Sequence, residues 1–170
     1  MSITIAKPLS SRKIEQYAMN IRSLSNCTDC YFDIISLIEK TIPKIDETFN
    51  FEYVDSQELE PNTYAYYDPA ENTIRVAEDV YVRASNDVGR DRFTLAHEVG
   101  HYMLHRNGIT FSRATAKTPI YCDPEWQANT FASALLIPRC STGSMTIEQI
   151  QEECKVSHQA AEIAFQRNSQ

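Results

Sequence analysis

The sequence predicts an α+β fold that is mostly helical, with a small three-stranded antiparallel sheet packed beside one central helix. Two observations carry this prediction. The segment 92–105 combines a largely apolar composition with two histidines and a glutamate at helical spacing. Three short stretches ahead of it, over 49–54, 62–67 and 72–77, are rich in aromatic and β-branched residues, as strands are.

The composition is typical of a globular protein with one core. The chain has 170 residues, of which 42% are hydrophobic and 23% charged. We expect residues 1–140 to form the main domain and residues 141–170 a short helical extension packed on it. The net charge of −7 argues against direct nucleic-acid binding, which needs clustered Lys and Arg. The sequence shows neither a signal-peptide pattern nor a membrane-spanning apolar run, so we expect a cytoplasmic protein.

Two amphipathic helices are expected before the strands. Apolar residues recur at helical spacing from Ser10 to about Leu24. Asp29 is a suitable cap for a second helix that runs to about Lys40 and that Pro43 ends. Both helices are predicted to pack against the core rather than to bind a cofactor.

The cysteines indicate free thiols. Their number is five, which is odd, and the single C-x-x-C pair, Cys27 and Cys30, has no second pair to complete a structural zinc site. It also lacks the β-α-β context of a redox motif. We therefore expect plain, partly buried thiols in a cytoplasmic protein.

The middle of the chain is expected to form the sheet and its connections. Turn-forming residues over 68–72 separate the second and third strands, which favours an antiparallel meander. A short helix is expected over 78–84, followed by a loop over 86–89. The segment 111–121 shows no clear period and is expected to be a loop that borders the cleft.

The segment 92–105 contains the pattern H-E-x-x-H as His97, Glu98 and His101. Residues i and i+4 of a helix share a face, so His97 and His101 can direct two imidazole nitrogens to one metal ion. Glu98 lies about 100° round the helix, where it can accept a proton from water without being a ligand. Asn107 and Gly108 are suited to end this helix. The pattern predicts a hydrolytic zinc site.

A third protein ligand is required, and several residues are candidates by type. They are His105, Asp123, Glu125, His158 and, more weakly, Cys122. His105 continues the histidine face, but one straight helix spreads three such residues over about 12 Å, whereas a Zn–N bond is about 2.0–2.1 Å. The third ligand is therefore expected from another helix.

The segment 123–138 is the favoured source of that ligand. Asp123 can cap a helix with Pro124 at its first position, and Pro138 ends it. Glu125 lies in the first turn, and a broad apolar face follows.

Together, H-E-V-G-H-Y-M-L-H and E-W-Q-A-N-T-F-A-S-A-L-L-I-P resemble the ImmA/IrrE family of metallopeptidase-like proteins. The resemblance implies a zincin-like domain over residues 1–140. It implies His97, His101 and Glu125 as zinc ligands and Glu98 as general base. Other divalent ions suit such a donor set, and two histidines with a carboxylate favour zinc.

The resemblance also implies a function. The expected activity is zinc-dependent peptide hydrolysis, and the expected partner is a protein substrate, namely a helix-turn-helix repressor of a mobile element or prophage. The alternative is a zinc-containing, non-catalytic module that binds a regulator or antitoxin. An oxyanion donor is needed as well. Tyr102, His105, Arg113 and Tyr121 are possible by type, and none is selected.

Two short helices are expected at the carboxyl end, the first after Thr146 and the second capped by Ser157. Their junction is similar to half of a helix-turn-helix, but acidic residues on the first helix argue against DNA contact. His158 is expected to be exposed or locally hydrogen-bonded.

Overall fold

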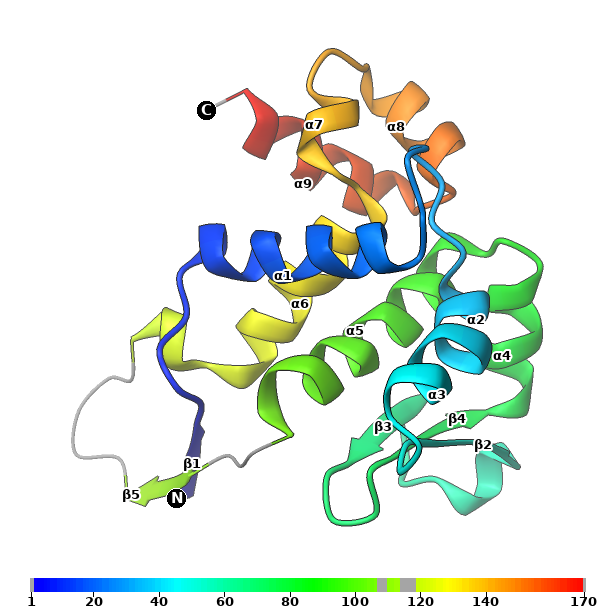
Figure 1. Cartoon of the computed structure of the whole chain (residues 1–170), viewed down its shortest axis with the longest axis vertical. Coiled ribbons are helices and arrows are strands. Elements are labelled where there is room, and N and C mark those ends of the chain that lie inside the picture. The colour runs from blue at the N-terminus through cyan, green and yellow to red at the C-terminus, as the bar shows by residue number, and fades with distance from the viewer. Residues whose placement is uncertain (1, 107–109, 114–118, 170) are drawn as a thin grey trace.

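Helix α5 (Gly89–His105) is the central element of the fold (Figure 1). The computed structural model describes residues 2–106, 110–113 and 119–169. Helix α6 (Pro124–Leu136) packs on one side of α5 and α1 (Ser11–Leu24) packs on α6, while a small sheet lies on the other side of α5. Helices α7 (Arg139–Thr142), α8 (Ile147–Cys154) and α9 (His158–Asn168) group together at one end of the molecule.

The remaining elements surround these helices. They are β1 (Ser2–Ile5), α2 (Ile34–Ser36), a π-helical turn (Leu37–Thr41), α3 (Ile42–Ile45), β2 (Asn50–Val54), β3 (Ala65–Asp68), β4 (Thr73–Ala77), α4 (Glu78–Ser85) and β5 (Thr110–Arg113), with short 3₁₀ turns at Ser56–Glu58 and Ile120–Cys122. The α+β class is confirmed. No helix in the described part of the chain is both long enough and apolar enough to cross a membrane.

The three-stranded sheet is mixed, so the prediction of a fully antiparallel sheet is wrong. Its order is β2-β4-β3, with β2 parallel to β4 and β3 antiparallel to β4. Strand β4 occupies the centre because four of its five residues are buried, whereas β2 is largely exposed. The connection from β2 to β3 therefore crosses β4, which leaves β3 as an edge strand beside α5.

The second predicted helix begins later and continues further than expected. Asp33, not Asp29, caps it by accepting a hydrogen bond from the Ser36 amide at 2.9 Å. Pro43 does not end the helix, because it lies within the first turn of α3, where a missing amide hydrogen is tolerated after the π-helical turn.

The predicted loop over 111–121 also differs from the structure. Residues Thr110–Arg113 form β5, which pairs antiparallel with β1; neither strand was predicted from the sequence. The predicted helix end at Asn107 and Gly108 lies outside the described residues, as do positions 114–118.

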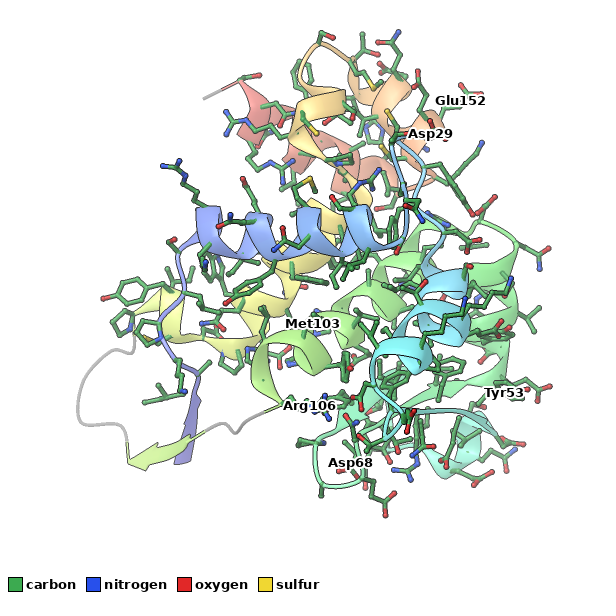
Figure 2. The ribbon with its side chains drawn as sticks, viewed as in Figure 1. Asp29, Tyr53, Asp68, Met103, Arg106 and Glu152 are labelled. Atoms are coloured by element: carbon green, nitrogen blue, oxygen red, sulfur yellow. The ribbon has the colours of Figure 1, made fainter. Side chains whose placement is uncertain are left out.

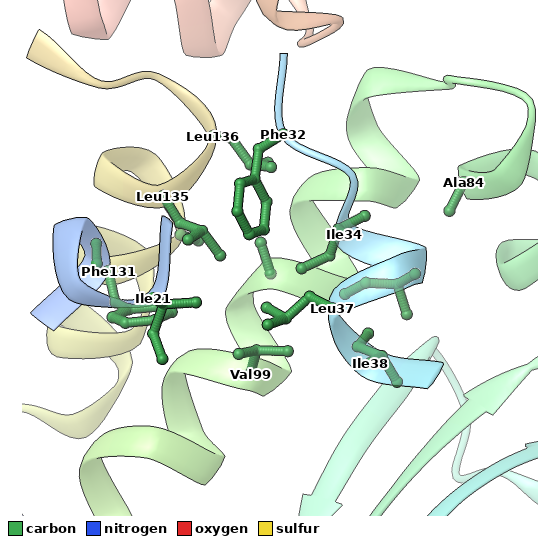
Figure 3. Close-up of a cluster of buried hydrophobic side chains, with 14 of the residues drawn as sticks. Ile21, Phe32, Ile34, Leu37, Ile38, Ala84, Val99, Phe131, Leu135 and Leu136 are labelled. Carbon is green, nitrogen blue, oxygen red and sulfur yellow. The ribbon is translucent and has the colours of Figure 1, made fainter. Parts of the chain in front are cut away.

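One hydrophobic core joins the two sides of α5. Figure 3 shows Ile21 of α1, Val99 of α5 and Leu135 of α6 facing Phe32 and Leu37. All of these side chains are at most 3% exposed. Burial of each such side chain contributes roughly 1.5–3 kcal/mol, so this cluster holds α5 and α6 in fixed relative positions.

The N-terminal end of α5 is fixed by the carboxyl-terminal helices. A Cβ atom on Gly89 would lie 2.4 Å from the backbone carbon of Val156, so only glycine permits this approach. Arg92 is buried, and its guanidinium donates to the carbonyl oxygens of Phe32 at 2.8 Å and Lys155 at 3.1 Å. These contacts tie α8 and α9 to the helix that carries the histidines.

The C-terminal end of α5 is fixed to the sheet by one carboxylate. Asp46 accepts hydrogen bonds from Tyr102 at 2.9 Å, Asn72 at 3.0 Å and the Thr48 amide at 3.0 Å, and it pairs with Arg106 at 2.6 Å. Figure 2 shows Arg106 at this end of α5, on the side of the sheet. Burial alone would raise the pKa of Asp46, but the hydrogen bonds from Thr48, Asn72 and Tyr102 hold it well below its ordinary value.

We predict that this carboxylate makes folding stability depend on pH in the acid range. A lowered folded-state pKa adds stability above the unfolded value of about 3.9, and that stability is lost as the pH falls below it. Asp46→Asn should lower the free energy of unfolding by about 1–3 kcal/mol near pH 7, because charged hydrogen bonds are lost. The difference from wild type should shrink toward about pH 2–3. Urea denaturation across this pH range measures it, and a difference that stays constant would contradict the prediction.

Candidate metal centre

The structure brings His97, His101 and Glu125 together at one point. The Nε2 atoms of His97 and His101 are 3.0 Å apart. The Glu125 carboxylate lies 3.3 Å from each of them, through Oε2 to His97 and Oε1 to His101. Among the described residues that could supply metal ligands, these form a set whose donor atoms all lie within 4.8 Å of one another.

These spacings fit a tetrahedral metal ion. Two ligand atoms of a tetrahedral zinc ion, each about 2.0–2.1 Å from it, are separated by about 3.3 Å. The two histidine nitrogens are 3.0 Å apart, and each lies 3.3 Å from a different carboxylate oxygen of Glu125, so a small adjustment of the Glu125 side chain allows the three residues to bind one ion. The Glu125 side chain is 65% exposed, which leaves one side of the site open to solvent. Two imidazoles, one carboxylate and an open position are the donor set of a catalytic zinc site.

A glycine in the motif allows the two helices to approach. A Cβ atom on Gly100 would lie 3.0 Å from both the Cα and the carbonyl oxygen of Ala128. Because Gly100 has no side chain, α6 packs directly against α5 at this level. Asp123 caps α6 and accepts from the Glu125 amide at 2.9 Å, so the start of the helix places Glu125 opposite the histidines.

Hydrogen bonds on the outer side of both imidazoles set their orientation. His97 Nδ1 lies 2.9 Å from the amide oxygen of Asn129, and His101 Nδ1 lies 3.0 Å from Nδ1 of His105. His105 Nε2 lies 2.9 Å from the amide oxygen of Gln127. Gln127 in turn donates to the carbonyl oxygens of Lys7 at 2.8 Å and Tyr121 at 2.7 Å.

This chain of hydrogen bonds determines which nitrogen carries each proton. Because Gln127 donates its amide hydrogens to two backbone carbonyls, its oxygen must accept from Nε2 of His105. Burial lowers the pKa of His105, so it is neutral and its Nδ1 accepts from Nδ1 of His101. Asn129 likewise accepts from His97. In the neutral form of each ligand histidine, the proton is therefore on Nδ1 and the lone pair is on Nε2, on the side of Glu125; without a metal ion, protonation of Nε2 allows the same nitrogens to hydrogen-bond the Glu125 carboxylate.

Glu98 lies beside this group in a less exposed position. The residue is 7% exposed, and burial raises its pKa, which the neighbouring His101 and His97 and a backbone hydrogen bond from Tyr67 offset only in part. In contrast, hydrogen bonds with His101 and His97 hold the pKa of Glu125 well below its ordinary value. The two glutamates therefore occupy different environments, one suited to proton transfer and one to binding a cation.

The other candidate ligands have different positions. His105 contacts His101 rather than the central point, Asp123 caps α6, and His158 is exposed on α9 with its Nδ1 3.2 Å from Gln151. Cys122 lies in the turn before α6 and does not belong to the set of converging donors in the described residues.

Two candidates for the oxyanion donor already have partners. Tyr102 donates to Asp46, and His105 lies between His101 and Gln127. Tyr121 is 48% exposed, and the side chain of Arg113 lies outside what the structure describes.

Sequence reasoning missed the roles of Gln127 and Asn129. Gln127 is fully buried although the other buried residues of α6 are apolar, and a polar residue in that position requires a buried partner. Asn129 follows Glu125 by four residues and shares its helix face. Both signals were present in the sequence, but the partners became evident only with α6 placed against α5.

The comparisons with known proteins agree with this geometry. A peptidase family described as the IrrE N-terminal-like domain matches residues 56–165. Among solved structures, a Mycobacterium tuberculosis transcriptional regulator matches 88% of this chain with a TM-score of 0.55 and 15% identity, which shows a shared fold. This chain spans 45% of that regulator's length. No curated protein gave a significant match.

The family match covers more than half of the chain and includes His97, Glu98, His101 and Glu125. It confirms the resemblance found in the sequence: the chain belongs to the peptidase family of IrrE N-terminal-like domains.

Proposed function

We propose that this protein is a zinc-dependent peptidase with His97, His101 and Glu125 as metal ligands and Glu98 as general base. The observation that carries the proposal is the convergence of three side chains: the Nε2 atoms of His97 and His101 are 3.0 Å apart and each lies 3.3 Å from a carboxylate oxygen of Glu125, with the buried carboxylate of Glu98 beside them. Membership in a peptidase family supports the same activity.

Each residue has a defined task in this proposal. His97, His101 and Glu125 hold the ion, and Asn129 and His105 keep the two imidazoles in the required tautomer. When bound, zinc supplies Lewis acidity and lowers the pKa of coordinated water toward neutrality. Glu98 accepts a proton from the attacking water and later delivers it to the leaving amine.

The edge of the sheet offers a place for an extended substrate. The Ala77 amide donates to the carbonyl of Tyr64, so Tyr64 and Tyr66 direct their backbone groups toward β4. Ala65 and Tyr67 therefore direct theirs toward the other edge of β3, where no further strand pairs among the described residues and the Tyr67 amide donates to Glu98. A peptide added as a further strand along this edge would place its carbonyl groups near the general base.

As substrate we propose a cytoplasmic helix-turn-helix repressor of a mobile element or prophage, as the family resemblance implies. The structural similarity to a protein described as a transcriptional regulator is compatible with this class of partner.

The first prediction concerns the general base. Glu98→Gln should retain zinc and the fold but reduce peptide hydrolysis by about 10²–10⁴-fold, because the proton acceptor is lost. The assay uses the zinc-loaded protein with a purified helix-turn-helix repressor and a library of quenched fluorogenic peptides. If wild type binds the repressor without cleaving it, and Glu98→Gln binds it equally well, the protein is a binding module and not a peptidase.

The second prediction concerns the third ligand. Glu125→Ala should lose most of the roughly one zinc ion per chain that we expect in wild type, because a direct ligand is removed. Elemental analysis after gel filtration measures the metal content. Glu162→Ala, which removes an exposed glutamate on α9, serves as the matched control and should retain zinc. Full zinc content in Glu125→Ala would assign the third ligand to another residue.

The third prediction concerns the hydrogen-bond chain behind His101. His105→Phe should weaken zinc affinity by about 10–100-fold, because His101 Nδ1 loses its acceptor while the volume at position 105 is nearly kept. Competition with a chromophoric chelator measures the affinity, and His158→Phe on the surface is the control. Equal affinities in both variants would show that His105 has only a packing role.

A further inference from the structure

A groove of about 950 Å³ lies next to the metal centre, between the α5–α6 pair and helix α9. Its walls include Phe93 and Thr94, which lie one helical turn before His97, and Trp126, which follows Glu125. Asn129 also lines the groove while its amide oxygen contacts His97 at 2.9 Å. The groove and the metal centre therefore share a wall, and a chain leaving the active site along α6 would enter it.

The charge of the groove is opposite to that of the protein as a whole. Arg90, Arg139 and Arg167 line it, and Glu15 is its one acidic residue, whereas the whole chain has a net charge of −7. Four arginines elsewhere lie within 4.0 Å of a carboxylate, namely Arg75, Arg83, Arg92 and Arg106. Within the described residues, no such ion pair involves the three groove arginines.

One of these arginines is also incompletely hydrogen-bonded. Arg167 donates through its terminal nitrogens to Ser133 at 3.3 Å and to the Ile137 carbonyl at 3.0 Å, which fixes the guanidinium against α6. Its Nε is buried and finds no acceptor among the described residues. Each terminal nitrogen uses one hydrogen in these bonds and keeps a second one, so a carboxylate in the groove would pair with the terminal nitrogens, and such charged hydrogen bonds are stronger than neutral ones.

The groove also offers apolar surface. Phe93 and Trp126 are partly exposed in its wall, and Ile163 of α9 is 57% exposed. Arginine and aromatic side chains together are typical of the positions that contribute most to protein–protein binding. A nucleic acid is a poorer match, because the net negative charge of the protein repels a polyanion over its whole length.

We propose that this groove binds an acidic segment of the protein substrate in which carboxylates alternate with large apolar side chains. The carboxylates pair with Arg90, Arg139 and Arg167, and the apolar side chains pack on Phe93, Trp126 and Ile163. This acidic segment is separate from the peptide bond to be cleaved, and it determines which proteins bind as substrates. The identity of the occupant as substrate rests on the proposed function, but its binding does not require hydrolysis.

Trp126 is the chain's single tryptophan, so its fluorescence reports directly on the groove. The titration uses zinc-loaded Glu98→Gln protein and an acetylated, amidated peptide of the sequence Glu-Leu-Glu-Asp-Leu-Glu-Glu-Leu. The comparison peptide replaces every Glu by Gln and every Asp by Asn. We expect saturable fluorescence change with the acidic peptide, at least tenfold weaker binding of the neutral peptide, and weaker binding at high salt.

Substitutions in the groove test its location. Arg90→Gln and Arg139→Gln should each weaken binding by about threefold to fivefold, and the double variant by about tenfold or more. Lys44→Gln removes one positive charge from the exposed surface of α3 and should leave binding unchanged. Circular dichroism checks that each variant remains folded.

Several results would overturn the proposal. Unchanged binding in the double variant would do so, since the acidic peptide would then be coordinating zinc or binding elsewhere. Equal binding of the neutral peptide would remove the role of charge, and tighter binding of a single-stranded oligonucleotide would assign the groove to nucleic acid. Groove binding by a wild-type protein that cleaves neither the repressor nor the peptide library would contradict the proposed function alone, and hydrolysis without groove binding would contradict this inference alone.

Discussion

The close packing of α5 on α6 at Gly100 and Ala128 is the constraint on which the site depends. At this contact the two helices approach until a single additional Cβ atom would meet backbone atoms at 3.0 Å. The approach brings Glu125 within 3.3 Å of both histidines. It is maintained by the core at the centre of α5 and by Arg92 and Asp46 near its two ends. A metal centre shared by two helices is only as well defined as the distance between them.

The same two helices carry polar residues on both sides of the metal ligands. On one side, His105 and Gln127 connect His101 to the backbone carbonyl of Tyr121, which precedes α6. This chain of hydrogen bonds fixes the tautomer of His101 without an additional charge. On the other side, Asn129 connects His97 to the arginine-lined groove. Metal binding and the proposed substrate recognition therefore depend on one pair of helices, and residues outside direct contact with the metal influence both.

The sequence was most informative where chemistry and spacing coincide. His97, Glu98 and His101 were predicted as site residues from their spacing in a helix, whereas Glu125 was selected by family resemblance and not by spacing. The helix capped by Asp123 was predicted because its start signal is local. The parallel pairing of β2 with β4 and the pairing of β1 with β5 were not predicted, since strand pairing depends on contacts distant in sequence. The helix through Pro43 was missed because a π-helical turn has no clear sequence signature.

The most direct test of this account is a crystal structure of the zinc-loaded protein with anomalous data collected at the zinc absorption edge. We predict one strong anomalous peak about 2.0–2.1 Å from Nε2 of His97, Nε2 of His101 and a carboxylate oxygen of Glu125, with a water molecule in the open position. His105 should remain in contact with His101 and outside the metal's coordination sphere. A peak bound by a cysteine, a peak without Glu125, or no zinc peak after soaking would contradict the central claim.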